Sequence, residues 1–194
     1  MATTRADGAR PTEADLAAAV VDGNPTRLDG RVVLADYDPA WPETFEREAA
    51  RIRSILGDDA RLIEHVGSTS VRGMAAKPVI DIALAVWDSR DEPSYLPRLE
   101  AAGYVLRIRE PEWHEHRLCK GPDTNINLHI FSASCPEIVR MLTFRDRLRS
   151  DPAAFERYLA AKQRLAARHW EFVQQYADAK SDVVEAIIAE APTS

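Results

Sequence analysis

Cysteine and long apolar runs are scarce in this sequence, and each scarcity argues against a class of protein. Only Cys119 and Cys135 are present among 194 residues, without CxxC spacing, so neither a disulfide framework nor a zinc site is expected. No apolar run approaches the ~20 residues of a membrane span, and the N-terminus lacks the apolar stretch of a signal peptide. We therefore expect reduced thiols, no membrane contact and a cytoplasmic location.

A concentration of charge of one sign is also missing. The formal net charge is −6, from 31 acidic and 25 basic residues that are mixed along the chain. A broad basic surface, the electrostatic footprint of nonspecific nucleic-acid binding, is therefore not expected. We expect no nucleic-acid partner, and the sequence does not determine an oligomeric state.

The sequence does contain enough apolar residues for one full core. Hydrophobic residues make up 45% of the chain, which suffices for one domain. Glycine and proline interrupt residues 1–30, where only Thr12 to Val21 has the pattern of a short helix with Thr12 as its N-cap. We expect this segment to be a partly ordered arm, or a helix packed on the domain or on a second subunit. The domain itself comprises residues 31–194, with an α/β core over 31–133 and a helical part over 136–191.

Hydrophobic periodicity predicts a mixed sheet covered by helices. Alternating or continuous apolar residues indicate strands, and apolar residues at helical spacing indicate helices. Strands are expected at 32–34, 61–66, 79–86, 104–108 and 125–131, the last as part of a hairpin with 116–120. Helices are expected at about 39–56 and 92–102, in two segments from 136 separated at 150–152, and at about 169–190. This order of elements is typical of the α+β class.

A polar loop between two predicted strands carries the first candidate site. The small residues Gly67, Ser68, Thr69 and Ser70 allow close approach of a ligand to the backbone, whose N–H groups can bind an anion. The strand that follows is apolar except for Asp81, and an unpaired buried carboxylate is costly. Asp81 therefore points into a cleft, pairs with a base such as Lys77, or binds a metal.

Histidine and arginine side chains on the later hairpin provide further candidates. His129 lies on the polar side of its strand and can transfer a proton or ligate a metal. Arg117 precedes that strand together with His114 and His116, and we expect these side chains to share one polar face. His114 and His116 are the weaker candidates, because a surface hairpin needs no special reason for a histidine.

Several segments between residue 31 and about residue 190 resemble a known family. They are Val33 to Asp36, Tyr37-Asp38-Pro39-Ala40-Trp41-Pro42, Glu64-His65-Val66-Gly67-Ser68-Thr69-Ser70, Ala76-Lys77-Pro78-Val79-Ile80-Asp81-Ile82, Asn127-Leu128-His129-Ile130-Phe131 and Phe144-Arg145-Asp146. On these residues the chain resembles the GrpB family (UPF0157). That family is similar in fold to the nucleotidyltransferase superfamily, and some of its relatives are fused to dephospho-CoA kinase.

The resemblance implies a site for a nucleotide and a divalent metal. Gly67 and Ser68 match the superfamily's Gly-Ser turn, and Asp81 matches its first metal-binding carboxylate. Ala83 stands at the second carboxylate position and His129 at the later acidic position, so the sequence departs from the pattern twice. The implied ligand is a nucleotide or another phosphorylated molecule, with Mg²⁺ on Asp81 and His129.

Roles follow for ten residues, with two functions left open. Asp81, His129 and Glu64 are the catalytic candidates. The phosphate-binding candidates are Gly67, Ser68, Thr69, Ser70, Lys77, Arg117 and Arg145. Alternatively, Glu64 pairs within the sheet, Lys77 neutralises Asp81 and Arg145 braces the helical part. The protein either transfers a nucleotidyl group, AMP, to an unknown acceptor, or is a catalytically weak module that binds a nucleotide or CoA-type ligand or assists a kinase.

Overall fold

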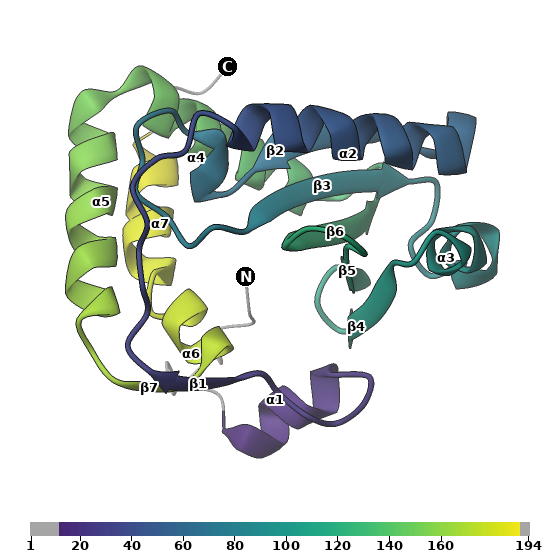
Figure 1. Cartoon of the computed structure of the whole chain (residues 1–194), viewed down its shortest axis with the longest axis horizontal. Coiled ribbons are helices and arrows are strands. Elements are labelled where there is room, and N and C mark those ends of the chain that lie inside the picture. The colour runs from purple at the N-terminus through teal and green to yellow at the C-terminus, as the bar shows by residue number, and fades with distance from the viewer. Residues whose placement is uncertain (1–11, 191–194) are drawn as a thin grey trace.

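The computed structural model describes residues 12–190 and contains a five-stranded mixed sheet (Figure 1). Its strands are β2 (Leu62–Val66), β3 (Ile80–Val86), β4 (Val105–Glu110), β5 (His116–Lys120) and β6 (Ile126–Ser132). They lie in the order β2-β3-β6-β5-β4. Strands β3 and β6 are parallel, and the other neighbours are antiparallel. The predicted α+β class with a mixed sheet is confirmed.

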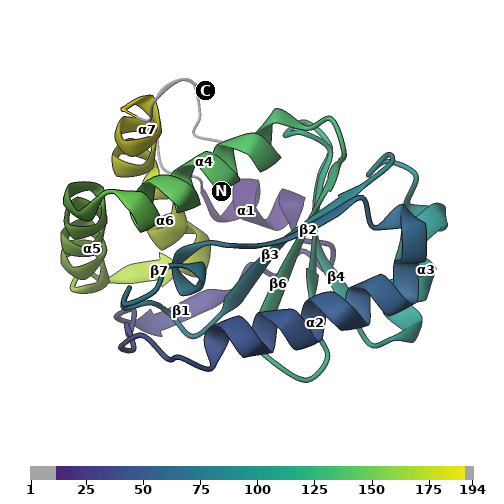
Figure 2. The ribbon, with the colours of Figure 1, turned by 90° about the horizontal axis from the view of Figure 1, so that it is seen from above.

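One face of the sheet, here called the closed face, is covered by helices α2 (Trp41–Leu56) and α3 (Glu92–Ala101). Figure 2 shows α2 on the opposite side of the sheet from α4. Asp38 supports the start of α2, since its Oδ1 accepts a hydrogen bond from the backbone N–H of Ala40. Helix α2 ends at Gly57, which has a φ of +56°. Its buried Ile52 belongs to the same apolar core as Ile82 of β3.

Helix α4 (Pro136–Ser150) covers part of the other face, here called the open face. Helix α5 (Pro152–Ala166) follows after a break at Asp151, whose carboxylate accepts hydrogen bonds from the N–H groups of Ala153 and Ala154. The predicted break between two helices is confirmed. Helices α4 and α5 share a second core with the last helix, α7 (Ser181–Ala189). Within residues 12–190, no helix is both long and apolar enough to cross a membrane.

The prediction of one continuous helix from 169 to 190 is wrong. The chain instead forms strand β7 (Trp170–Phe172), helix α6 (Val173–Asp178) and helix α7. Strand β7 pairs with β1 (Arg27–Gly30), about 140 residues earlier in the chain. Buried Trp170 and Phe172 alternate with exposed Glu171 in this strand. This long-range pairing is absent from the local sequence pattern, which is why helical spacing was misleading there.

The predicted strand at 32–34 is also wrong. Val33 is 78% exposed, and this stretch is extended chain with one isolated bridge nearby, from Ala35 to Ala76. Upstream, helix α1 (Glu13–Ala19) begins with the expected Thr12 cap and buries Leu16 against the domain. The remainder of the predicted arm, residues 1–11, lies outside the described residues.

Candidate functional site

The turn after β2 passes directly over the carboxylate of Asp81. Gly67 has a φ of +69°, and a Cβ atom built at this position would lie 2.5 Å from Asp81 Oδ2. Any larger residue would therefore be strained and would displace the carboxylate. Residues Ser68–Ser70 then form one turn of 3₁₀ helix. Glycine at position 67 therefore allows the backbone of the turn to pass close to the Asp81 carboxylate.

Two of the three hydroxyls in this turn hold the turn itself in place. The Ser70 hydroxyl donates to Gly67 O at 2.6 Å, and the Thr69 hydroxyl donates to Val79 O at 3.0 Å. Thr69 also contacts Nε2 of buried His65 at 3.1 Å. Within residues 12–190 the Ser68 hydroxyl makes no hydrogen bond, so it is the turn hydroxyl that a ligand can use.

Asp81 projects from β3 onto the open face, beside two polar side chains of β6. Asn127 Nδ2 donates to Asp81 Oδ1 at 2.7 Å, and His129 Nε2 lies 3.6 Å from the same oxygen. Burial alone would raise the pKa of Asp81, but the interactions with His129 and Asn127 outweigh it and leave the pKa below its usual value. The Asp81 side chain is 29% exposed, so an ionised carboxylate faces the space in front of the sheet.

His129 is the cavity end of a row of polar side chains. Its Nδ1 lies 3.1 Å from Nε2 of His116, and Nδ1 of His116 lies 2.7 Å from Glu110 Oε2. Burial lowers the pKa of His116 well below its usual value and raises the pKa of Glu110. The row fixes the plane of the His129 ring and directs its Nε2 toward Asp81.

All four lysines of the chain lie at this site. The sequence contains four lysines and 21 arginines. Lys77, Lys162 and Lys180 line one cavity with Asp81 and His129. Lys120 donates to Asn127 Oδ1 at 2.5 Å, and burial lowers its pKa, as it does for Lys77. Arginine supplies the cations elsewhere in the fold, most of them at the surface, whereas lysine is confined to the cavity and its edge.

The cavity has a volume of about 230 Å³ and lies between the open face and the helical part. Its walls are largely apolar, with contributions from Val66, Leu118, Met141, Phe144 and Val184. Asp81 is the one carboxylate among its lining residues. The hydroxyl of Tyr176, buried at the cavity wall, has no hydrogen-bond partner within residues 12–190. Three lysines and a tyrosine with an unsatisfied hydroxyl therefore line the same space.

The structure brings together most, but not all, of the predicted site residues. Asp81, His129, Gly67, Ser68, Thr69 and Lys77 all line the cavity. Glu64 and Arg145 lie outside that lining and bond to each other, with Arg145 Nη1 2.6 Å from Glu64 Oε2. Arg145 also donates to His65 O at 3.1 Å. Arg145 thus braces α4 against β2, as its structural alternative has it, whereas Glu64 pairs with this helix residue and not within the sheet.

Arg117 is on the wrong face of the sheet for the predicted phosphate contact. Its neighbour Leu118 pairs with His129 and shares the open face, so Arg117 faces the opposite side. There it donates from Nε to Glu92 Oε1 of α3 at 2.6 Å. The expectation that His116 and Arg117 share one polar face is therefore wrong, because adjacent residues in a strand point to opposite faces.

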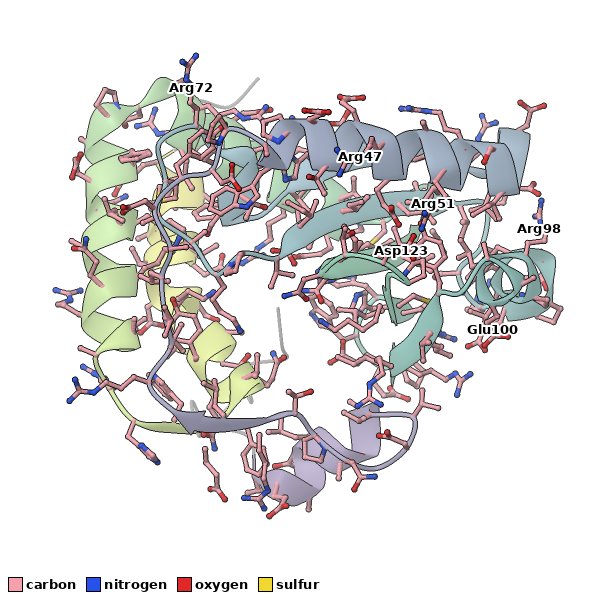
Figure 3. All side chains as sticks on the ribbon, viewed as in Figure 1. Arg47, Arg51, Arg72, Arg98, Glu100 and Asp123 are labelled. Carbon is pink, nitrogen blue, oxygen red and sulfur yellow. The ribbon has the colours of Figure 1, made fainter. Side chains whose placement is uncertain are left out.

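Arg72, next to the glycine turn, also lies away from the cavity. It lines a separate shallow groove with Arg149 and Phe155, and Figure 3 shows its side chain at the outer edge of the molecule. Figure 3 also shows Arg51 of α2 beside Asp123 of the β5–β6 hairpin, with which it forms an ion pair on the exposed surface. Arg72 and Arg51 therefore lie on the outer surface and do not contribute to the cavity.

Four residues of the site escaped the sequence reasoning: Asn127 as a partner of Asp81, and Lys162, Tyr176 and Lys180 from the helical part. They were missed because they lie far from the glycine turn in sequence, from 60 residues after Gly67 for Asn127 to 113 residues after it for Lys180. One signal was available, since a chain with 21 arginines and only four lysines marks each lysine as unusual.

The donor set suits Mg²⁺ only with help from a ligand. No group of three or more His, Cys, Asp or Glu side chains within residues 12–190 is arranged to hold a metal ion. Asp81 supplies one carboxylate, and imidazole is a poorer ligand for this hard cation than oxygen. Mg²⁺ here would need phosphate and water oxygens to complete its coordination.

The fold and the site place the chain in a class of α+β proteins with a lysine-lined cavity between a mixed sheet and a helical layer. The chain belongs to the GrpB family: the family model described as "GrpB protein" matches residues 31–190. A UPF0157 protein of Halalkalibacterium halodurans is 57% identical over 160 residues, 82% of either chain.

Two further comparisons concern a solved structure and a longer relative. The crystal structure of the conserved protein GrpB from Enterococcus faecalis matches with a TM-score of 0.72 and 32% identity, over 82% of this chain and 96% of that one. A dephospho-CoA kinase of Mycolicibacterium paratuberculosis is 30% identical over 158 residues, 68% of this chain and 39% of the kinase. The predicted GrpB family is confirmed.

Proposed function

We propose that the cavity binds a small phosphorylated ligand, of which a nucleotide is the class to test first. The observation that carries the proposal is the gathering of Lys77, Lys162 and Lys180 around one apolar-walled space with a single carboxylate. Buried cations without an equal number of anions are costly. A phosphate group supplies the missing negative charge and accepts several hydrogen bonds at once.

The glycine turn and the lysines have different roles in this proposal. Ser68 and the backbone of the turn contact phosphate oxygens from the β2 side, where Gly67 permits close approach. Lys77 and Lys180 neutralise the phosphate charge from the cavity wall. The apolar side chains of the wall accommodate the remainder of the ligand.

Mg²⁺ enters the proposal as a companion of the ligand. Asp81 would hold it through one carboxylate oxygen, with His129 beside it. When bound, the ion would neutralise phosphate charge and polarise a phosphoryl oxygen. The hydrogen bond from Asn127 keeps the Asp81 carboxylate oriented whether or not the ion is present.

Transfer of a nucleotidyl group, AMP, is the enzymatic version of this function. It is supported by the position of His129, whose Nε2 faces the cavity and whose ring is held by His116. His129 would move a proton at Nε2 while Asp81 fixes its orientation. The acceptor is not specified by any residue of the site.

A binding or accessory module is the second candidate function. It is favoured by Ala83, which is fully buried in the apolar core beneath α4 and supplies no second carboxylate. The likeness to a dephospho-CoA kinase supports a module that binds a CoA-type ligand or assists such a kinase. Such a module would use the same cavity without transferring a group.

The binding proposal is tested by melting temperature with ATP, AMP, CoA and inorganic phosphate, each with and without Mg²⁺. A ligand at 100 times its Kd adds about 2.7 kcal/mol to the free energy of unfolding, which we expect to appear as a shift of several degrees. Lys180→Gln should lower the apparent affinity about tenfold, whereas Arg53→Gln, an exposed residue of α2, should not change it. Absence of a shift with every ligand would contradict the proposal.

The two versions of the function are separated by product formation from labelled ATP. For an enzyme, the wild-type protein gives a product with some member of a metabolite panel, and Asp81→Asn loses the product while retaining binding. For a module, the wild type gives no product across the panel although nucleotides or CoA raise its melting temperature.

A further inference from the structure

Lys162 is the most deeply buried lysine of the cavity and is only 2% exposed. It projects from the middle of α5, and its Nζ donates to the backbone carbonyl of Ala75 at 2.5 Å. The Nζ also lies 5.3 Å from the ring centroid of Tyr158. Among residues 12–190, no carboxylate forms an ion pair with it. A protonated Lys162 therefore contacts a carbonyl oxygen and an aromatic ring directly, and the charge of Asp81 acts on it without forming an ion pair.

The choice of lysine at this position is chemically informative. Arginine supplies 21 of the 25 basic side chains, yet it stays protonated in proteins and cannot act as a nucleophile. Burial lowers the pKa of Lys162 to about 7, with the charge of Lys180 acting in the same direction and the charge of Asp81 opposing them. This environment favours the neutral amine that a nucleophilic lysine requires.

Tyr176 provides an independent sign of a missing ligand atom. Its residue is 2% exposed, and its hydroxyl has no hydrogen-bond partner within residues 12–190. The ring is held by the edge of Trp170, at 6.3 Å between centroids, and by Lys180 Nζ at 4.7 Å from its centroid. A buried hydroxyl left unpaired costs free energy, and an oxygen atom of a ligand in the cavity would satisfy it.

We propose that the Lys162 amine forms an imine with an aldehyde or ketone group of a phosphorylated ligand, and that the Tyr176 hydroxyl hydrogen-bonds to the reacting oxygen. The amine nitrogen bonds to the carbonyl carbon and gives up one proton to the carbonyl oxygen, which forms a carbinolamine. The carbinolamine hydroxyl and the second amine proton then leave together as one water molecule, and a C=N bond remains. No oxidant or reductant is required.

This inference rests on the proposed function for the phosphate half of the ligand. Lys77 and Lys180 line the same cavity as Lys162, so a small molecule can place its phosphate on them and its carbonyl at Lys162. The volume of about 230 Å³ suits a compact ligand. The substrate class is therefore a small phosphorylated carbonyl compound.

Borohydride trapping tests the inference, with pyridoxal 5′-phosphate and pyridoxal as probes. The scarcity of lysine makes the readout direct, because four side chains compete for the label. After reduction, peptide mass spectrometry should find at least about tenfold more label on Lys162 than on Lys77, Lys120 or Lys180. Lys162→Met should lose this label, whereas Arg53→Gln, at an exposed position of α2 outside the cavity, should retain it on Lys162.

Tyr176→Phe gives the second arm. Because this variant removes an unpaired buried hydroxyl, its melting temperature should be unchanged or slightly raised. The rate of trapping at Lys162 should fall several-fold. Circular dichroism of Lys162→Met, and of Lys162→Arg as an alternative, checks that the variants fold. Label spread evenly over the four lysines, or none at Lys162 in the wild type, overturns the inference.

The two probes separate this inference from the proposed function. Equal trapping by pyridoxal and pyridoxal 5′-phosphate supports a reactive Lys162 and counts against a phosphate site. Melting shifts with phosphorylated ligands, together with no label at Lys162, support the phosphate site and overturn the imine.

Discussion

The two faces of the same sheet differ in what their helices leave uncovered. On the closed face, α2 and α3 cover the sheet with one continuous apolar core that includes Ile82 and Ile130. On the open face, α4 covers only part of the sheet, and the side chains beyond it are Asp81, Asn127 and His129. Residues one position apart in β3 thus serve stability and ligand binding separately.

The difference shows that the alternation of side chains along a strand separates the residues that stabilise the core from those that line the cavity. Asp81 and Ile82 are adjacent, as are Arg117 and Leu118, and in each pair one side chain lies on the closed face and the other lines the cavity on the open face. The helical part then decides the character of the open face by adding Lys162, Tyr176 and Lys180. Four experiments can break or sharpen this comparison.

The largest effect is expected from Ile82→Ala on the closed face. Ile82 is fully buried, and a truncation of this kind costs about 2–5 kcal/mol. Urea unfolding should show this loss, with ligand affinity per folded molecule unchanged. The matched variant Asp81→Asn, one residue earlier, should change stability by less than about 1 kcal/mol. Equal costs for the two variants would contradict the division of roles.

A pH dependence of similar size is expected from His65 on the closed face. Burial between Phe45 and the sheet lowers its pKa to about 4, with Arg149 and Arg145 acting in the same direction and Asp81 opposing them. The unfolded chain, with a pKa near 6.5, binds more protons below that pH, so stability falls as the pH drops from about 6.5 to about 4 and levels off below. The shift corresponds to about 3 kcal/mol.

The variant His65→Gln isolates this contribution from that of the carboxylates. Urea unfolding at pH 7 and pH 4 should show a smaller loss for the variant than for the wild type, by about 3 kcal/mol. An identical loss in both proteins would place the titration elsewhere.

A smaller, site-specific effect is expected from Gly67→Ala. The new Cβ would meet Asp81 Oδ2 at 2.5 Å, and the φ of +69° strains any residue other than glycine. The strain costs about 1–3 kcal/mol, and the altered turn, which can no longer approach the ligand closely, should also lose ligand binding. Gly23→Ala is the matched control, since it has the same φ but nothing within 4 Å. Thermal melting should rank Gly67→Ala below Gly23→Ala, and only the former should lose binding.

The smallest effect is expected from Arg117→Gln. Glu92 retains Arg109, which donates to it at 2.6 and 2.7 Å, so the loss of one buried charged hydrogen bond should cost about 1 kcal/mol. The melting shift produced by a phosphorylated ligand should be unchanged. A weakened ligand response would instead restore Arg117 to the phosphate site.

Much of the fold followed from local pattern. Helix α2 and the break at Asp151 were predictable because caps, prolines and apolar spacing act within a few residues. Strand β7 was not, since its partner β1 lies far away in the sequence and no breaker marks its start. Helical spacing of Phe172 and Tyr176 is equally compatible with the strand and short helix observed.

The candidate site divides along the same line. The turn at Gly67, the isolated Asp81 and the polar side of β6 were visible in the sequence, because a charge in an apolar strand and a glycine at a strand end are local signals. The face on which Arg117 lies depends on the strand register. The bond between Glu64 and Arg145 depends on the placement of α4.

The sequence by itself indicated the glycine turn, the isolated Asp81, the strands that carry them and the restriction of lysine to four positions. Only the tertiary structure decided that these four lysines meet, because α5 and α7 come to the open face through long-range packing with no trace in local periodicity. Strand alternation and helix capping fix the direction of side chains within one element, whereas packing brings side chains of different elements together. The cavity is the product of both.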